Sequence, residues 1–194
     1  MAGRPRSFDR SAAIDRFVEV FWAQGYSATS VDDLQAAVGI KRSSFYAAFI
    51  DKETAYRLAF ARYLETVAVD AFDVLALPAG DRAGLAAFVR FVGRFLAAHR
   101  GRGCFMLSAV ADPPLVDDAE ALDELRVELR QRIAAQVKAI AKRRELKTGE
   151  TAQKLEAYVL AVVLGLNGMA RANESARAIR DAADLAARFL EASL

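Results

Sequence analysis

The chain is 194 residues long and 54% hydrophobic, so it can bury a sizeable core and is not intrinsically disordered. A formal net charge of +2 excludes a strongly basic protein that coats nucleic acid without specificity, although it permits a local basic face. One Cys and one His exclude an internal disulfide framework and are too few for a zinc site within one chain. We therefore expect a protein of a reducing, cytoplasmic setting, without a metal ion or a cofactor.

The sequence also lacks the patterns of export and membrane insertion. No apolar segment follows Arg4 and Arg6, which argues against a signal peptide. The longest nearly apolar stretch, residues 157–166, ends at Asn167 and is shorter than the ~20 residues of a membrane-spanning helix. We therefore expect no membrane partner.

Hydrophobic spacing predicts an all-α fold of about nine helices, because no window alternates apolar and polar residues as a strand does. In the first helix, about residues 9–24, apolar residues from Ile14 to Trp22 share one face, and Gly25 is placed to end the helix. Ser30 is placed to cap a second helix that ends near Gly39. The other predicted helices cover about residues 42–48, 52–75, 81–99, 104–111, the segment between Pro114 and Arg144, 151–172 and 175–192.

The second and third of these helices have the parts of a helix-turn-helix, joined by a turn that contains Gly39. Phe45 and Phe49 lie four residues apart in the third helix and can face inward together. One helix fits the major groove of DNA, where its first turn reaches base edges while nearby cations and hydroxyls bind phosphates. The outward positions are then Ser43, Tyr46 and Ala47, and the flanking cations are Lys41, Arg42 and Lys52.

A longer pattern carries a family resemblance: Gly25-Tyr26, Thr29-Ser30-Val31, Leu34, Ala37, Gly39-Ile40, Ser44-Phe45-Tyr46, Phe49 and Lys52-Glu53. In this order and spacing the residues closely resemble the signature of the tetracycline-repressor (TetR) family of transcriptional regulators. The resemblance implies a DNA-binding domain, residues 1–52, and a helical ligand-binding and dimerisation domain, residues 53–194. It also implies a homodimeric repressor that binds a palindromic DNA operator and leaves it when a small molecule enters the second domain. The apolar residues and the Cys of that domain, described below, indicate an apolar or electrophilic effector.

The sequence departs from the family pattern at the start of the third helix. Lys41 stands where the family usually has a Ser, so the usual cap is missing, and Ser43 stands where the family often has Gly. Arg4 and Arg6 are either the arm of a minor-groove contact or a frayed terminus. The predicted DNA-binding residues are Arg4, Arg6, Thr29, Lys41, Arg42, Ser43, Ser44, Tyr46 and Lys52.

Small residues form a stripe along one face of the eighth predicted helix, where they permit close helix approach. In the family, the last two helices pair with those of a second copy as a four-helix bundle. A contact within one chain is the alternative. The predicted interface residues are Ala157, Ala161, Gly165, Gly168, Ala172, Ile179, Ala182, Ala186 and Phe189.

The second domain has more apolar side chains than one core-facing stripe requires, as the lining of an effector pocket would. An ordinary core would look the same, and Asn167 is a polar handle either for a ligand or for a partner helix. The predicted pocket residues are Phe88, Phe91, Phe95, Cys104, Phe105, Met106, Tyr158 and Asn167.

Cys104 is the candidate redox switch. It follows two Arg residues, Arg100 and Arg102, and stands at the start of a predicted helix, and both features favour the reactive thiolate. The Gly-Cys pair resembles a branch of the family in which some members respond to reactive species. The alternative is a small buried hydrophobe.

Two other classes of function fit the sequence less well. An enzyme needs a catalytic group with its partners or a cofactor loop, and the chain has one His and no glycine-rich phosphate motif. A helical protein-interaction module that uses the basic run Lys142 to Lys147 is the second alternative, although such a run is also typical of a solvated helix end. We therefore expect a regulator rather than an enzyme.

Overall fold

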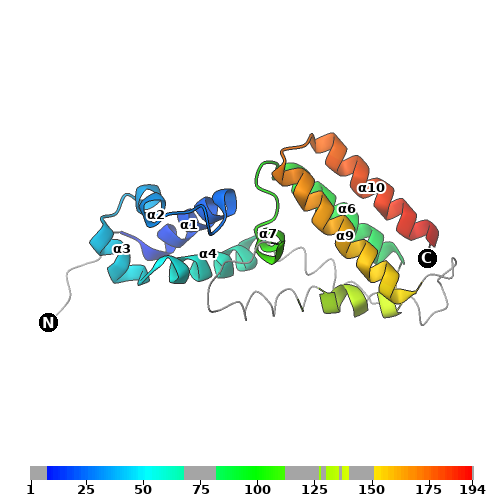
Figure 1. The fold of residues 1–194 in the computed structure, drawn as a ribbon, viewed down its shortest axis with the longest axis horizontal. Helices are drawn as coiled ribbons and strands as arrows, with labels where there is room; N and C mark the ends of the chain where they lie inside the picture. The colour runs from blue at the N-terminus through cyan, green and yellow to red at the C-terminus, as the bar shows by residue number, and fades with distance from the viewer. Residues whose placement is uncertain are drawn as a thin grey trace. The chain divides into compact units, whose positions relative to one another are not determined.

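The computed structural model describes residues 8–67, 82–111, 127, 130–135, 137–139 and 151–193. Every regular element in these ranges is an α-helix, which confirms the predicted all-α fold. The chain divides into two compact units, the first of which ends at Val67 (Figure 1). None of the helices described is long and apolar enough to cross a membrane.

The first unit contains α1 (Arg10–Gln24), α2 (Val31–Val38), α3 (Arg42–Phe49) and α4 (Lys52–Thr66). Local caps set the bounds of α1: the Asp9 side chain accepts hydrogen bonds from two backbone N–H groups, and Gly25 ends the helix with a positive φ of 79°. The predicted helix over 9–24 is therefore confirmed.

Aromatic rings hold α1 against α3 and α4. Phe17 contacts Phe49 of α3 edge to face, with ring centroids 4.8 Å apart. On α4, Tyr63 meets Trp22 in the same geometry at 5.1 Å, and Tyr56 meets Phe21 at 5.1 Å. Because α4 packs along α1, it belongs to the first compact unit, which reaches Val67. The predicted division between the two functional domains at residue 52 stays a prediction.

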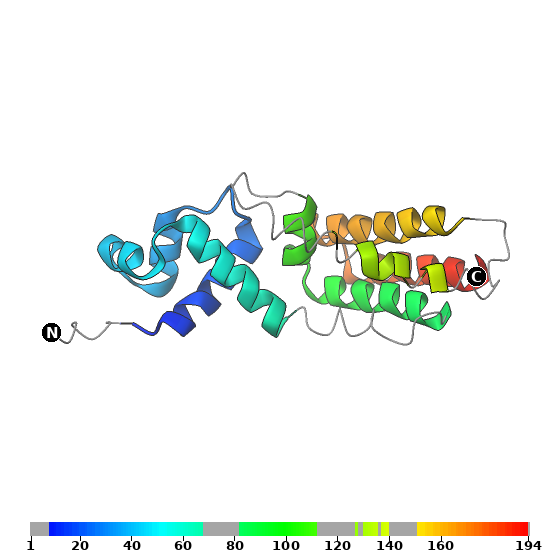
Figure 2. The same ribbon diagram turned by 90° about the horizontal axis from the view of Figure 1, so that it is seen from below.

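The second unit contains α6 (Arg82–Ala98), α7 (Phe105–Ala111), α9 (Ala152–Arg171) and α10 (Ala176–Ser193). In both ribbon views α6, α9 and α10 run side by side (Figures 1 and 2). Gly93 permits the close approach of α6 to α10, since a Cβ built on it would lie 2.3 Å from the Ala183 Cβ. Arg90 on α6 adds a bidentate ion pair with Glu191 on α10, at 2.6 and 3.0 Å.

Two of the predicted helices are only partly covered by this description. The end of the fourth, beyond Val67, lies outside the described residues, as does most of the long helix between Pro114 and Arg144. Two of its predicted inward positions, Ile133 and Val137, are described and are fully buried.

Candidate nucleic-acid interface

The turn that presents α3 is fixed by the caps of α2. Ser30 Oγ accepts a hydrogen bond from the Asp33 N–H at 3.1 Å, and the Asp33 carboxylate accepts one from the Ser30 N–H at 2.8 Å. The hydrogen bonds from the Ser30 hydroxyl and N–H stabilise the ionised carboxylate and hold the pKa of Asp33 below its ordinary value. Gly39 ends α2 in the left-handed conformation at φ 72° and ψ 33°, which turns the chain toward α3.

The two sides of α3 differ as predicted. Phe45 and Phe49 are fully buried, whereas Ser43 is exposed and Tyr46 is 41% exposed. Lys41 stands at the N-cap position and makes no side-chain cap, as the replacement of the usual Ser predicts. Lys41 and Arg42 are exposed, and Ser44 is half-buried. Five of the predicted DNA-binding residues therefore gather on or at the edge of the outward side of α3.

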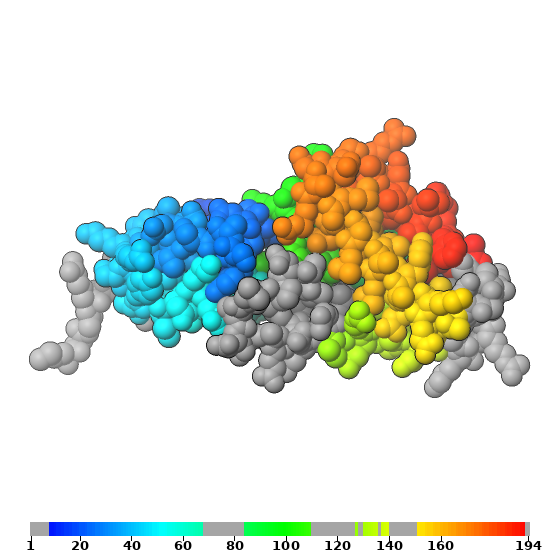
Figure 3. Space-filling model, viewed as in Figure 1, coloured from blue at the N-terminus to red at the C-terminus, as the bar shows by residue number. Residues whose placement is uncertain are grey.

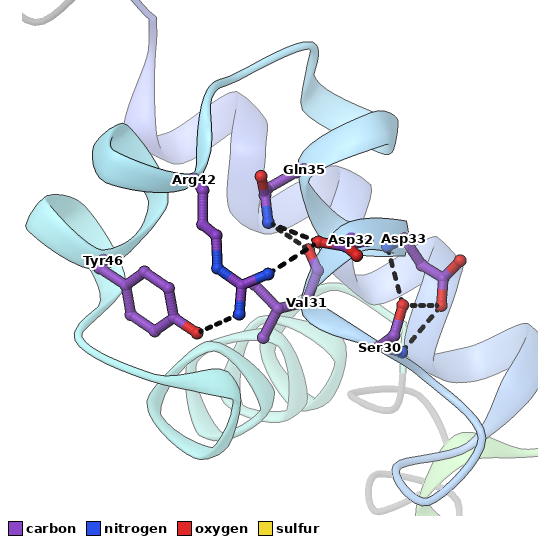
Figure 4. Close-up of polar contacts among 7 residues, drawn as sticks. All are labelled: Ser30, Val31, Asp32, Asp33, Gln35, Arg42 and Tyr46. Atoms are coloured by element: carbon purple, nitrogen blue, oxygen red, sulfur yellow. Dashed lines mark hydrogen bonds and ion pairs between the residues drawn. The ribbon is translucent and has the colours of Figure 1, made fainter.

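Arg42 is engaged by two side chains, one from each helix of the motif (Figure 4). Its Nη1 lies 3.3 Å from Asp32 Oδ1 on α2, and its Nη2 donates a hydrogen bond to the Tyr46 hydroxyl at 3.4 Å. The guanidinium also lies over the Tyr46 ring, 5.6 Å from its centroid. Gln35 Nε2 donates to the same Asp32 oxygen at 3.2 Å and to the Val31 carbonyl at 3.2 Å.

Two residues predicted to bind phosphates have structural partners instead. Thr29 is only 2% exposed, and its hydroxyl donates to the Gly25 carbonyl at 2.7 Å, so we remove it from the predicted DNA contacts. Lys52 is half-buried, and its Nζ donates to the carbonyls of Tyr26 at 3.1 Å and Thr29 at 3.0 Å. The Nζ also lies 4.1 Å from the centroid of the Tyr26 ring, so Lys52 joins the start of α4 to the turn between α1 and α2.

Asp32, which contacts Arg42 from α2, was not among the predicted DNA-binding residues. A signal was present, because a carboxylate in the first turn of one helix and a cation in the first turn of the next can meet across a short turn. Arg10 was not predicted either: its Nε donates a hydrogen bond to the carbonyl of Ala48 in α3 at 3.4 Å. Arg4 and Arg6 lie outside the described residues.

The predicted pocket residues of the second unit fall into separate surroundings. Phe88, Phe105 and Met106 are buried, whereas Phe91 is half-buried. Phe95, also half-buried, has its ring centroid 4.3 Å from that of His99. Tyr158 contacts Phe189 on α10, with ring centroids 4.9 Å apart.

Asn167 connects α9 to the start of α7. Its Oδ1 accepts a hydrogen bond from the Cys104 N–H at 2.7 Å, and its Nδ2 donates to Ser108 Oγ at 3.4 Å. Asn167 is buried, as is Cys104, the residue directly before α7. The Asn167 side chain, predicted to bind a ligand or a partner helix, therefore forms hydrogen bonds within its own chain.

Some of the residues predicted to form the dimer interface are exposed, and others are buried within the chain. Ala157, Ala161, Gly165 and Gly168 are exposed along α9, and Ala172 is exposed just beyond its end. Figure 3 shows α9, in yellow and orange, at the surface of the face in view. Phe189 is 48% exposed, and Leu185, which the prediction did not include, is 64% exposed. Ala182 is half-buried, whereas Ile179 and Ala186 are buried within the chain on the side of α10 that packs in the unit. We therefore remove Ile179 and Ala186 from the predicted interface.

The geometry of α2, the glycine turn and α3 defines a helix-turn-helix protein. The family described as "Bacterial regulatory proteins, tetR family" matches residues 14–54, which span this motif and most of α1. The chain is 35% identical over 108 residues to the HTH-type transcriptional repressor ComR of Escherichia coli, a match that covers 55% of this chain and 51% of ComR. A match to the uncharacterized regulator YezE of Bacillus subtilis is 27% identical and covers 57% of each chain. The chain thus spans about half the length of the curated relatives it matches.

Solved structures resemble the chain over nearly its whole length. A cysteine mutant of the TetR family transcriptional regulator CifR, complexed with 26-base-pair operator DNA, is 28% identical with a TM-score of 0.73, covering 96% of this chain and 98% of that one. A TetR transcriptional regulator from Chloroflexus aurantiacus is 25% identical with a TM-score of 0.76, covering 94% and 93%. The chain thus matches the TetR family model at residues 14–54, and it is similar to solved TetR-family regulators over nearly its whole length.

Proposed function

We propose that the chain is a homodimeric transcriptional repressor that binds a palindromic DNA operator through α3. The observation that carries this proposal is the division of α3 into a buried aromatic side and an exposed side with Lys41, Arg42, Ser43 and Tyr46. Such a helix supplies both base-edge donors and phosphate-binding cations. The match to the TetR family model at residues 14–54 and the operator complexes of CifR support DNA as the partner.

The proposed partner at the other end of the chain is a second copy. At Gly165 and Gly168 an added Cβ would meet nothing within 4 Å, so no packing within the chain requires glycine there. Glycine inside a helix costs about 1 kcal/mol relative to alanine. The exposed Leu164, Leu185 and Phe189 supply apolar area on the same two helices. These features support an isologous interface, which also gives a helix-turn-helix protein its paired half-sites.

A selection from randomised DNA duplexes tests operator binding. The purified chain should enrich an inverted repeat with half-site centres about 34–36 Å apart, or a multiple of this spacing. Fluorescence anisotropy on the enriched duplex at several salt concentrations should give a log–log slope of about −0.9 per phosphate contacted.

Matched alanine variants locate the DNA-binding surface. Lys41→Ala should weaken binding and reduce the magnitude of the slope by about 1. Arg180→Ala, which removes the same charge from an exposed position on α10, should change neither quantity. Enrichment of no sequence, or an equal loss in both variants, would contradict the proposal.

The proposed switch is a small apolar or electrophilic effector that acts on the second unit and lowers operator affinity. Two routes are open to it. In the first, a reversible ligand is bound among the apolar side chains around Phe88, Phe105 and Met106. In the second, the Cys104 sulfur adds to an electron-poor carbon–carbon double bond of the effector beside Asn167: a sulfur–carbon bond forms, the π bond breaks, and the thiol proton is transferred to the neighbouring carbon. The position of Cys104 supports the second route, because its N–H donates to Asn167 of α9, so an adduct on its sulfur would disturb the contact between α7 and α9.

Cys104→Ser separates the two routes. If the thiol is the sensor, N-ethylmaleimide should release operator DNA from the wild-type protein and not from the variant. If a reversible ligand is the effector, both proteins should respond to the same compound in an anisotropy screen. Release of DNA from Cys104→Ser by N-ethylmaleimide would contradict the thiol route.

A further inference from the structure

The surroundings of Arg42 assign it a role different from that of a simple phosphate-binding cation. We propose that Asp32 determines specificity: with Tyr46 it positions Arg42 to read a guanine in the major groove and keeps the guanidinium away from phosphates. This inference rests on the proposed function, because it concerns how the same surface distinguishes one DNA sequence from another.

The contacts hold the plane of the guanidinium. Asp32 engages Nη1 from α2 and Tyr46 engages Nη2 from α3, so two helices restrain the same side chain (Figure 4). Each terminal nitrogen carries a second N–H, and a pair of such groups matches O6 and N7 of guanine. A restrained fork loses less conformational freedom when it binds a base than a free side chain does.

The carboxylate is itself anchored. Gln35 Nε2 bridges Asp32 Oδ1 and the Val31 carbonyl, which ties the carboxylate to the backbone of its own helix. Asp32 lies in the first turn of α2, where the helix dipole favours a negative charge. Arg42 begins α3, where the dipole disfavours a positive charge, so the pair offsets an electrostatic mismatch that Arg42 alone would create.

Electrostatics then favours a base edge over a phosphate. A phosphate that approaches Arg42 also meets the negative charge of Asp32, whereas the guanine edge is neutral and offers only acceptors. The two side chains are 64% and 78% exposed, and an ion pair this exposed contributes little to stability. A stabilising role alone is therefore a weak explanation for the arrangement.

Arg42→Lys tests the base-reading role, with the enriched operator duplex and its single base-pair substitutions as probes. Lys keeps the positive charge but lacks the planar fork. The variant should lose roughly tenfold or more of the preference for guanine at one base pair per half-site. Its affinity for a non-specific duplex should stay within about twofold of the wild-type value, because the charge is retained.

Asp32→Asn tests the role of the carboxylate. Affinity for the non-specific duplex should rise roughly threefold or more, and the guanine preference should fall at the same base pair that Arg42→Lys affects. Asp32→Glu, which keeps the charge, should restore the preference. Asp15→Asn is the charge-matched control, since it removes one carboxylate from an exposed ion pair with Arg62 between α1 and α4. Circular dichroism melts establish that each variant is folded.

The outcomes separate this inference from the proposed function. If Arg42→Lys keeps every base preference, or if Asp32→Asn shifts all duplexes by the same factor as Asp15→Asn, the inference is overturned while operator binding stands. If the wild-type chain enriches no sequence, the proposed function fails, and this inference fails with it.

Discussion

The outward side of α3 and the outward side of α9 and α10 are both exposed, but their chemistry differs. On the first, the exposed groups are polar and engage one another, as Arg42 does with Asp32 and Tyr46. On the second, they are apolar or lack a side chain, as at Leu185, Phe189 and Gly165, and the glycine borders open space. A polar surface whose ion pairs exchange easily suits a charged, hydrated partner, and an apolar surface suits one that excludes water. Exposure alone would not have distinguished the two.

The largest effect should come from placing charge on the apolar surface. In the double variant Leu185→Asp and Phe189→Asp, two carboxylates would have to be buried without partners for a dimer to form. We expect the dimer dissociation constant to rise by about 100-fold or more, measured by sedimentation velocity. Operator affinity should fall with it, because a monomer contacts only one half-site.

Arg180→Asp is the control for this double variant, since it adds the same side chain at an exposed position of α10 on a different side of the helix. It should remain as associated as the wild-type protein. If the double variant still sediments as a dimer, the dimer interface lies elsewhere. The outward side of α9 and α10 would then not be a surface that binds a second copy.

Two glycines of the second unit test which helix surfaces are packed within the chain and which are open. Gly93→Val forces a branched side chain into the Ala183 Cβ, and overpacking of this kind should lower the free energy of unfolding by about 1–3 kcal/mol or more. Gly165→Ala, made in the Leu185→Asp and Phe189→Asp background, should instead raise it by up to ~1 kcal/mol through helix propensity. Urea unfolding followed by circular dichroism measures both. Equal destabilisation by the two changes would show that α9 is covered within its own chain.

Lys52 and Lys41 test which cations of the first unit are structural. Lys52→Met removes the hydrogen bonds to the carbonyls of Tyr26 and Thr29, and should lower the free energy of unfolding by roughly 1–3 kcal/mol. Lys41→Met should leave it within about 0.5 kcal/mol, because the side chain is exposed and caps nothing. For the salt dependence of DNA binding we expect the reverse: Lys41→Met should change it more than Lys52→Met does. A Lys52→Met protein with unchanged stability would return Lys52 to the phosphate-binding set.

The smallest expected effect is a loss of stability at low pH that depends on Asp33. Hydrogen bonds from Ser30 lower the pKa of Asp33 from its ordinary value of 3.8, so the ionised form is favoured in the folded state. This contribution is fully present above the ordinary value and is lost as the pH falls through the lowered pKa. The stability difference between wild-type protein and Asp33→Asn should therefore shrink between about pH 5 and pH 2, as followed by urea unfolding. A difference independent of pH would mean that the cap does not depend on the charge.

Sequence reasoning succeeded where the signals are local. Ser30, Gly25 and Gly39 fix helix ends within a few residues of themselves, so the bounds of α1 and α2 followed from short patterns. The inward direction of Phe45 and Phe49 followed from their spacing in the same way.

The predictions that failed concern residues whose surroundings are built by three helices. The burial of Thr29 and the carbonyl partners of Lys52 depend on how α4 returns to the turn between α1 and α2, and no local pattern encodes that return. On α10 the apolar residues occupy more than one side of the helix, so periodicity does not tell which side meets α6. That is why Ile179 and Ala186 were placed on the wrong side, while the exposed Leu185 was missed.

The glycines of the second unit should be under two different kinds of selection. At Gly93 any side chain disturbs α6 and α10, so selection for folding alone would exclude substitutions there. At Gly165 and Gly168 the isolated chain would accept many residues, and only selection for assembly would exclude them. A deep mutational scan read once for abundance and once for repression would therefore separate the residues that shape the subunit from those that shape the complex.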